Sequence, residues 1–481
     1  MDDQTALTRR TLINRAALAG AASIVDGMAA QAQTPPAPAA AGEYLIRGAH
    51  VLSMDPMIGD LPRGDIHVRA GEIVAVGRDL DASGAQVIDG RNMIALPGLI
   101  ETHWHMWGAV ARNMAGETAK TGYFPFSREL GAQFTPQDNA RGVRLALAEA
   151  VHSGITTVHN WSHNLLTPAH ADAELAVHRE VSSRARFGYG YSRNTGADET
   201  LPLDDVARVQ KQWFAPGEAL LTLGIASRGP ENNTLEICRK EWDTARKLGI
   251  PISCHMGTHP IASNVNAGII QSHKVDGIEV LDQANLLGPD VLIVHATWST
   301  DRDMERLAAT KTPVSLSPYT ELRTGFGITP VDRFLKFGVP VSLSVDTTLL
   351  CGNADMFAIM KAIQNIADGA APSEFDIHPR RVLQMATIDG ANALGIGDKV
   401  GSLSPGKRAD LILVRTTDIN MAPLTEPVRM IVQSAQPANV DLVMVDGRIL
   451  KLDGRLTTVD VARVVADATE TINRVRAAVK M

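Results

Sequence analysis

The middle of the chain alternates short apolar runs with segments of helical length, and this pattern restricts the fold more than any other feature. The apolar runs begin near Leu99, Ile155, Arg186, Leu220, Ile252, Val291, Val314 and Val341. One intervening segment starts near Pro136 and spaces Val143, Leu147 and Val151 four apart, as one face of a helix does; another covers 234–248. Strands alternating with helices in this number predict an α/β fold, a (β/α)8 TIM barrel. A doubly wound sheet competes, but no Gly-x-Gly-x-x-Gly follows the first run.

Both ends of the chain are instead rich in strand patterns. Short alternating segments occupy residues 44–48, 65–69 and 72–77 near the start and 411–414 and 440–445 near the end. Gly71 separates two of them and predicts a tight hairpin. We therefore expect one small β-sandwich domain built from residues 43–95 and 396–455, a barrel over residues 96–395, and a closing helix over residues 456–481.

Residues 1–33 resemble a twin-arginine export signal. Arg9 and Arg10 stand in the run TRRTLIN, a weakly apolar, alanine-rich stretch follows, and Ala30-Gln31-Ala32 fits a small-residue cleavage site. Residues 34–42 form a Pro/Ala linker with few side chains that could pack a core. We expect an exported, periplasmic protein, or a cytoplasmic one if the first residues are only a disordered extension.

The composition excludes several classes of partner. The 481 residues are 45% hydrophobic and carry a net charge of −7, without the basic stripe that nucleic-acid binding requires. Beyond the N-terminus, no stretch has the ~20 apolar residues of a membrane span. The three cysteines provide neither a disulfide framework nor a CxxC metal motif. We expect a homo-oligomer that binds a small molecule and neither nucleic acid nor a membrane.

Residues of the kinds that bind metals stand at the ends of several predicted barrel strands. His103 and His105 end the first run, and since strand residues two apart point the same way, both can face one ion. His255 ends the fifth run, His295 the sixth and Asp346 the eighth. The C-terminal strand ends of a barrel share one face, so these groups are expected to meet. Imidazoles with one carboxylate suit Zn²⁺ or Fe²⁺, which lowers the pKa of a bound water towards ~7.

The layout resembles the amidohydrolase superfamily, in particular the group of cytosine deaminase, guanine deaminase and the s-triazine hydrolases (chlorohydrolases). The matching segments, spread over residues 43–450, are LPGLIETHWH (96–105), LALAEA (145–150), SGITTV (153–158), SLSVD (342–346), ATIDGANALG (386–395) and residues 401–414. The resemblance implies that His103, His105, His255 and Asp346 hold one divalent metal, zinc in the first place and iron as the alternative. It also implies that His295 positions the water or stabilises the oxyanion, and that Asp346 serves as the base. No lysine ends the fourth run, which argues against the two-metal variant.

One position departs from the pattern of these deaminases. They usually carry a glutamate three residues after the fifth-strand histidine, where it moves a proton to the ring and the leaving amine, whereas this chain has Thr258. Threonine does not transfer a proton near neutral pH. Glu321, after the seventh run, is our candidate for that role or for substrate binding. Thr258 and Trp104 complete the predicted substrate-binding set, since a tryptophan near a strand end can wall a flat pocket.

Three further histidines follow the second run. We expect His159, His163 and His170 to form hydrogen bonds rather than a second metal site, because the ligand set is already complete. The long first loop, residues 106–135, is of the kind that often covers the pocket in this fold.

These residues together predict a metal-dependent hydrolase. We expect metal-activated water to cleave a non-peptide C–N or C–Cl bond of a small heterocyclic or aromatic molecule. Cleavage of an amide or urea bond is the nearest alternative. A metal-dependent lyase or decarboxylase is a second, because the same site could polarise a carbonyl without delivering water. A non-catalytic exported binding protein is a third, and the intact ligand set argues against it.

Overall fold

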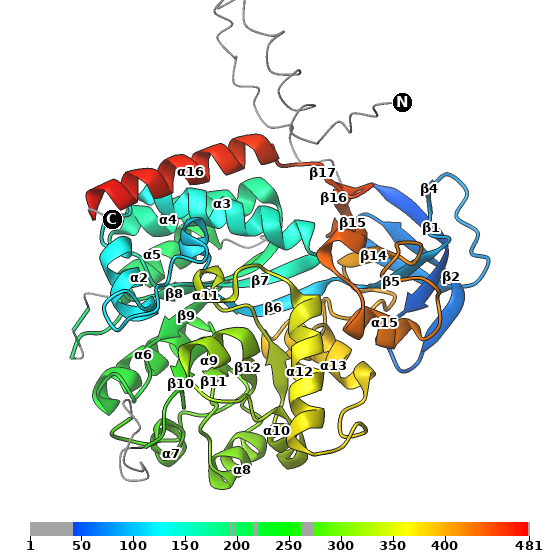
Figure 1. Cartoon of the computed structure of the whole chain (residues 1–481). Helices are drawn as coiled ribbons and strands as arrows, with labels where there is room; N and C mark the ends of the chain where they lie inside the picture. Colours follow the sequence, from blue (N-terminus) through cyan, green and yellow to red (C-terminus); the bar gives the residue numbers. More distant parts are fainter. Residues whose placement is uncertain (1–41, 193–194, 197, 215–219, 262–272, 480–481) are drawn as a thin grey trace, which may run out of the picture. The chain divides into compact units, whose positions relative to one another are not determined.

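The computed structural model describes residues 42–479, except 193–194, 197, 215–219 and 262–272 (Figure 1). The predicted export signal, residues 1–33, and all but the last residue of the linker lie outside the described residues. In the part of the chain that is described, no helix is both long enough and apolar enough to cross a membrane.

Eight parallel strands form the predicted barrel. They are β6 (Leu99–Trp104), β7 (Ile155–Ser162), β8 (Arg184–Gly190), β9 (Leu221–Ser227), β10 (Ile252–Met256), β11 (Val291–His295), β12 (Val314–Leu316) and β13 (Val341–Leu343). Neighbours pair in chain order, and a bridge between Trp104 and Asp346 joins the last strand to the first. All eight predicted strands are confirmed; the largest offset is at β8, which begins at Arg184 rather than Arg186.

Helices follow the barrel strands and cover the outside of the barrel (Figure 1). They are α2 (Tyr123–Gly131), α3 (Pro136–His152), α4 (Pro168–Val181), α5 (Leu203–Trp213), α6 (Leu235–Leu248), α7 (Gly277–Gln283), α8 (Asp301–Ala309), α9 (Pro318–Thr324), α10 (Val331–Phe337), α11 (Thr348–Cys351), α12 (Met356–Ala370), α13 (Pro379–Met385) and α14 (Ile388–Ala393). The two helices predicted by periodicity are α3 and α6. A capping box of Thr135 and Asp138 starts α3, and Gly249 ends α6 with a φ of +67°.

The main core lies between the barrel strands and these helices. Val143, Leu147 and Val151 of α3 are buried there with exposures of 0%, 0% and 1%, which confirms the predicted apolar face. Full burial of such a side chain stabilises the fold by roughly 1.5–3 kcal/mol. This packing fixes the strands whose ends hold the polar residues described below.

The two chain ends share one mixed sheet of nine strands. It contains β1 (Glu43–Leu52), β2 (Asp60–Arg69), β3 (Glu72–Gly77), β4 (Gln86–Asp89), β5 (Met93–Pro97), β14 (Leu411–Arg415), β15 (Val440–Val445), β16 (Arg448–Leu452) and β17 (Arg455–Leu456). β5 pairs with β14 and so joins the two ends. The predicted composite β domain is confirmed, and where we expected a sandwich the strands follow one continuous sheet. The hairpin at Gly71 is also present: Arg69 pairs with Glu72, and Ala70 and Gly71 turn the chain with φ of +50° and +82°.

Two sets of ion pairs attach the terminal segments to the barrel. The Arg184 guanidinium of β8 donates to both Asp410 carboxylate oxygens, at 2.7 and 3.0 Å, and both side chains are buried. Arg141 of α3 pairs with Glu470 at 3.1 Å on α16 (Val461–Ala478), which lies beside α3 (Figure 1). The predicted closing helix is confirmed as α16. The C-terminal segment also contains α15 (Pro427–Gln433) and the 3-10 helix Pro437–Asn439.

Candidate active site

Four histidines and one aspartate meet at the C-terminal ends of β6, β10, β11 and β13. His103 Nε2 and His105 Nε2 each lie 3.2 Å from Asp346 Oδ1. His255 Nε2 lies 3.1 Å from His103 Nε2, and His295 Nε2 lies 3.8 Å from Asp346 Oδ2. The structure therefore brings together all five residues predicted for the metal site and its chemistry.

The backbone is strained at two of these residues. His295 has a φ of +76° and Asp346 a φ of +65°, a region that costs a non-glycine residue about 1–3 kcal/mol. Two backbone hydrogen bonds hold Asp346 in its strained conformation: the Asp346 N–H donates to His103 O at 2.8 Å, and the His105 N–H donates to Asp346 O at 2.7 Å. These bonds fix the Asp346 carboxylate against the two imidazoles of β6.

The donor set fits one divalent cation. Burial lowers the pKa of His103 and of His255 well below the usual histidine value, and neighbouring imidazoles lower it further. Both rings are therefore neutral at pH 7 and have nitrogen lone pairs to offer, as metal binding requires. Among the described residues, the groups whose ligand atoms lie within 4.8 Å of one another are His103, His105 and His255, and His103, His295 and Asp346.

Buried groups behind the histidines hold them in place. Glu101 accepts hydrogen bonds from the N–H groups of His103 at 2.7 Å and Val345 at 3.1 Å, and burial raises its pKa to about 8. His105 Nδ1 lies 3.1 Å from Trp161 O, so its Nε2 is the nitrogen that faces Asp346. Such contacts fix which ring nitrogen a histidine presents to a metal.

Glu321 holds His295 from behind. Its Oε1 lies 3.2 Å from His295 Nδ1 and accepts the Ser317 N–H at 2.8 Å, while Oε2 accepts the Thr329 hydroxyl. The side chain is 0% exposed and does not line the pocket. The prediction that Glu321 shuttles protons to substrate or binds it is therefore wrong in its geometry, because the carboxylate is used to orient His295.

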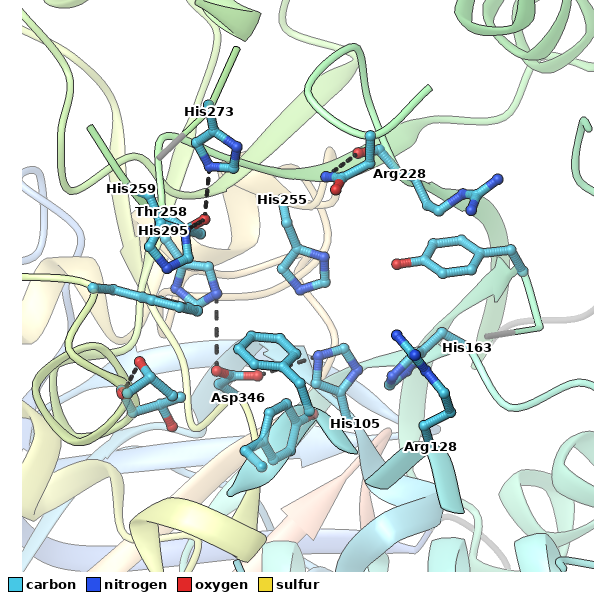
Figure 2. Close-up of a pocket in the computed structure, with 17 residues that line it drawn as sticks. His105, Arg128, His163, Arg228, His255, Thr258, His259, His273, His295 and Asp346 are labelled. Carbon is cyan, nitrogen blue, oxygen red and sulfur yellow. Dashed lines mark hydrogen bonds and ion pairs between the residues drawn. The ribbon is translucent and has the colours of Figure 1, made fainter. Parts of the chain in front are cut away.

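A cavity of about 430 Å³ opens above the five residues (Figure 2). It is lined by His105, Tyr123, Phe124, Arg128, His163, Tyr191, Arg228, Asn232, His255, Thr258, His259, His273, His295, Thr320, Thr324, Phe326 and Asp346. Thr258 is thus at the pocket, as predicted. Trp104 does not line the pocket. Adjacent strand residues point to opposite sides, so its side chain points away from His103 and His105 and is completely buried in the main core. The prediction that Trp104 binds substrate is therefore wrong.

The first long loop contributes one wall of this pocket. Tyr123, Phe124 and Arg128 of α2 line it, whereas Phe126 turns into a separate buried cluster. The aromatic rings of Phe124 and Phe326 lie 6.2 Å apart, so an apolar surface faces the cavity from two elements.

The charged groups at the pocket are mostly cationic. Arg128 and Arg228 lie on one side together with His163 (Figure 2). Arg228 donates to Thr195 O at 2.8 Å and lies 5.0 Å from the centre of the Tyr191 ring. Among the described residues, neither Arg128 nor Arg228 forms an ion pair at the pocket. Asp346 is the carboxylate-bearing residue among those that line the cavity.

The structure also shows a hydrogen-bonded chain that sequence reasoning missed. His273 Nε2 lies 3.0 Å from Glu231 Oε2 and 3.0 Å from Thr258 Oγ1, which in turn lies 3.0 Å from His259 Nδ1. Only the adjacency of Thr258 and His259 to the fifth strand could have indicated part of it. Glu231 and His273 come from loops without periodic pattern.

His159 in β7 and His163 and His170 after it form hydrogen bonds, as predicted. His159 Nδ1 lies 2.9 Å from Thr102 O, and His170 closes the capping box of α4. Trp107 Nε1 donates to His163 Nδ1 at 3.3 Å. None of the three belongs to the two groups of ligand atoms found in the described residues.

Comparison with known proteins places this geometry in a family. The model of the amidohydrolase family matches residues 94–450. The chain belongs to the amidohydrolase family. The predicted resemblance is thereby confirmed, and the barrel with a sheet from both chain ends is the architecture of its structural neighbours.

Among curated relatives, this amidohydrolase is similar to two deaminases over nearly its whole length. It is 28% identical over 439 residues to the 5'-deoxyadenosine deaminase of Methanosarcina mazei, covering 89% of this chain and 96% of the relative. It is 27% identical over 435 residues to the 5-methylthioadenosine/S-adenosylhomocysteine deaminase of Desulforamulus reducens, covering 89% and 97%.

Solved structures share the fold. An adenosine deaminase from Xanthomonas campestris with bound zinc superposes with a TM-score of 0.81 at 23% identity, covering 92% of this chain and 100% of the other. An atrazine chlorohydrolase from Arthrobacter aurescens complexed with zinc superposes with a TM-score of 0.78 at 23% identity, covering 89% and 100%.

Proposed function

We propose that this amidohydrolase hydrolytically displaces an exocyclic substituent, in the first place an amine, from a small nitrogen heterocycle, using one zinc ion. The proposal rests on one observation: four histidines and Asp346 converge on the floor of the pocket. The relatives support it, because those reported above are deaminases and one structural neighbour is a chlorohydrolase.

The roles of the residues follow from their positions. His103, His105, His255 and Asp346 would hold the cation, which supplies Lewis acidity for activating water. Asp346, 3.8 Å from His295 and open to the cavity, accepts a proton from the attacking water. His295, held by Glu321, faces the developing negative charge and stabilises it.

The metal we propose is zinc. Three imidazoles with one carboxylate form a borderline nitrogen–oxygen donor set that zinc and iron both accept. Zinc is preferred because it is bound in the two structural neighbours described above. Iron in the purified protein would contradict this part of the proposal alone.

The positive charge on one side of the pocket indicates which charge the substrate carries. Arg128 and Arg228 face a cavity whose lining carboxylate, Asp346, is taken up by the metal site. We propose that the substrate carries an anionic group, such as a carboxylate, remote from the reacting carbon. An arginine such as Arg128 binds such a group through two parallel hydrogen bonds. Arg228, whose terminal nitrogens donate to Thr195 O and Gly196 O, adds positive charge on the same side.

Product analysis in ¹⁸O-labelled water tests the reaction. The zinc-loaded protein would be screened against aminopurine nucleosides, aminopyrimidines, amino- and chloro-s-triazines, ureas and aryl amides, with neutral and carboxylate-bearing members of each class. We expect ammonia or chloride release with one ¹⁸O in the product, and a lower KM for the carboxylate-bearing members. A product without label would point to a lyase or decarboxylase, and no turnover at full metal occupancy to a binding protein.

We further propose that residues 1–33 direct export through the twin-arginine route, which carries folded, metal-loaded proteins. The support is the pair Arg9 and Arg10 with the following alanine-rich stretch. Fusion of these residues to a reporter is expected to send it to the periplasm, and replacing both arginines by lysine should stop export. A reporter retained in the cytoplasm with the native arginines would contradict the proposal.

A further inference from the structure

Displacement of an amine needs a proton donor as well as a base. The nitrogen leaves as ammonia only after it gains a proton, whereas chloride leaves without one. Asp346 and His295 are committed to the water and to the developing charge, and Glu321 is buried behind His295. A further group on the pocket wall is placed to be this donor.

His273, Thr258 and His259 lie on the pocket wall next to His295 (Figure 2), and Glu231 contacts His273 from outside the lining. Successive contacts measure 3.0 Å from Glu231 Oε2 to His273 Nε2, 3.0 Å from that nitrogen to Thr258 Oγ1, and 3.0 Å from Thr258 Oγ1 to His259 Nδ1. A hydroxyl accepts one proton and donates another, so Thr258 can link the two imidazoles.

Glu231 fixes this chain to the strand that carries His255. Its side chain is 3% exposed, and its two oxygens accept the Gly257 N–H at 2.9 and 3.2 Å. The His273 side chain is 13% exposed, so it contacts the buried carboxylate on one side and stays within reach of solvent.

We propose that this chain is the proton relay for the leaving group, with His259 as the residue that touches the substrate and Thr258, His273 and Glu231 acting through it. The inference rests on the proposed function. It also explains how Thr258 serves at a position where a carboxylic acid was expected: the hydroxyl conducts the proton instead of supplying it.

Water oxygen forms a bond to the ring carbon and gives one proton to Asp346, while the C–N bond breaks and its electron pair goes to nitrogen. His259 Nε2 gives its proton to that nitrogen, which leaves as ammonia. His259 Nδ1 then takes the Thr258 hydroxyl proton, and Thr258 takes the proton of His273 Nε2 while His273 Nδ1 takes one from solvent. Asp346 gives the water proton to solvent, and exchange with solvent restores the starting tautomers of both histidines. Overall, the amino compound and water become the hydroxy compound and ammonia.

The decisive experiment compares two leaving groups on one ring. The probes are adenosine with 6-chloropurine riboside and an amino-s-triazine with its chloro analogue, and the pair that the wild type hydrolyses is used. Glu231→Gln, His273→Gln and His259→Gln should each lower kcat for the amino compound about 100-fold or more, the usual contribution of general acid catalysis. For the chloro compound the loss should stay below about threefold, because chloride needs no proton.

Matched variants separate this role from a structural one. Thr258→Ser retains a hydroxyl and should keep most of the amine activity, whereas Thr258→Val should lose it as His259→Gln does. Glu305→Gln, on the exposed face of α8, and His152→Gln, at the end of α3, should change neither rate.

The outcomes separate failure of the relay from failure of the proposed hydrolytic function. If the relay variants slow both compounds equally, or neither, the relay is refuted and the proposed function stands. If the zinc-loaded wild type hydrolyses neither pair, nor the wider panel, both proposals fall.

Discussion

Two histidines of the site differ in what they touch, and this separates their functions. His255 Nε2 lies 3.1 Å from His103 Nε2, in the group of ligand atoms that it forms with His103 and His105, whereas His295 belongs to the group with His103 and Asp346. His295 Nδ1 is instead bound to Glu321 at 3.2 Å, and its Nε2 lies 3.8 Å from Asp346 Oδ2, farther than the 3.2 Å that separates His103 and His105 from Asp346 Oδ1. We therefore expect one to hold the metal and the other to act on the substrate.

Substitution tests that division. His255→Ala should lose metal and activity together. His295→Asn should keep the metal while kcat falls about 10²–10³-fold, the usual cost of losing one oxyanion donor. Metal analysis beside steady-state kinetics measures both, and equal metal loss in the two variants would show that the roles are misassigned.

The carboxylate behind His295 should affect turnover without affecting binding. Glu321→Gln keeps the shape but weakens the charge-assisted hydrogen bond to His295 Nδ1, so kcat should fall about 10–100-fold, with KM and metal content unchanged. Glu305→Gln serves as the surface control. A change in KM alone, with kcat unaltered, would contradict the role of Glu321 in orienting His295.

Sequence identified the groups at strand ends and failed where a side chain's partner comes from a distant loop. His103, His105, His255, His295 and Asp346 could be placed because barrel strands end on one face. The function of Glu321 could not, since its residue type gives no indication that it is buried against His295. The same holds for Glu231 and His273, whose contacts depend on tertiary packing alone.

At the scale of helices and strands, α3 packs closely against the short 3-10 helix Met106–Ala111 that follows His105. A Cβ on Gly142 of α3 would stand 2.1 Å from Trp107 O, in backbone that cannot yield. Gly369, in the last turn of α12, is exposed, and a Cβ there would meet nothing within 4 Å.

These two glycines form a matched test of packing. Gly142→Ala should lower the free energy of unfolding by about 1–3 kcal/mol because it overpacks the contact. Gly369→Ala should leave it unchanged or raise it by up to ~1 kcal/mol, since alanine favours a helix. Urea denaturation measures both, and equal effects would contradict the close packing of α3 against the segment beside His105.

Element prediction succeeded where periodicity was strong. The face of α3, the stop of α6 at Gly249 and the hairpin at Gly71 all follow from local chemistry. The strand order of the terminal sheet could not be predicted in this way. The pairing of β5 with β14 depends on contacts between the two chain ends, and the alternation within each strand does not reveal them.

At the scale of the whole molecule, buried ion pairs connect the barrel to the terminal sheet. Arg184 reaches Asp410 at 2.7 Å and Asp446 at 3.5 Å, which links β8 to the segments around β14 and β15. The expected homo-oligomer stays a prediction, which sedimentation of the purified protein would test.

The central claim is that one cation, held by His103, His105, His255 and Asp346, is required for hydrolysis. The most direct measurement removes metal by thorough chelation and restores zinc stepwise while activity and bound zinc are recorded. We predict that activity is lost on chelation and returns in proportion to zinc, with the endpoint at about one ion per chain. Full activity in chelated protein with no bound metal would contradict the account.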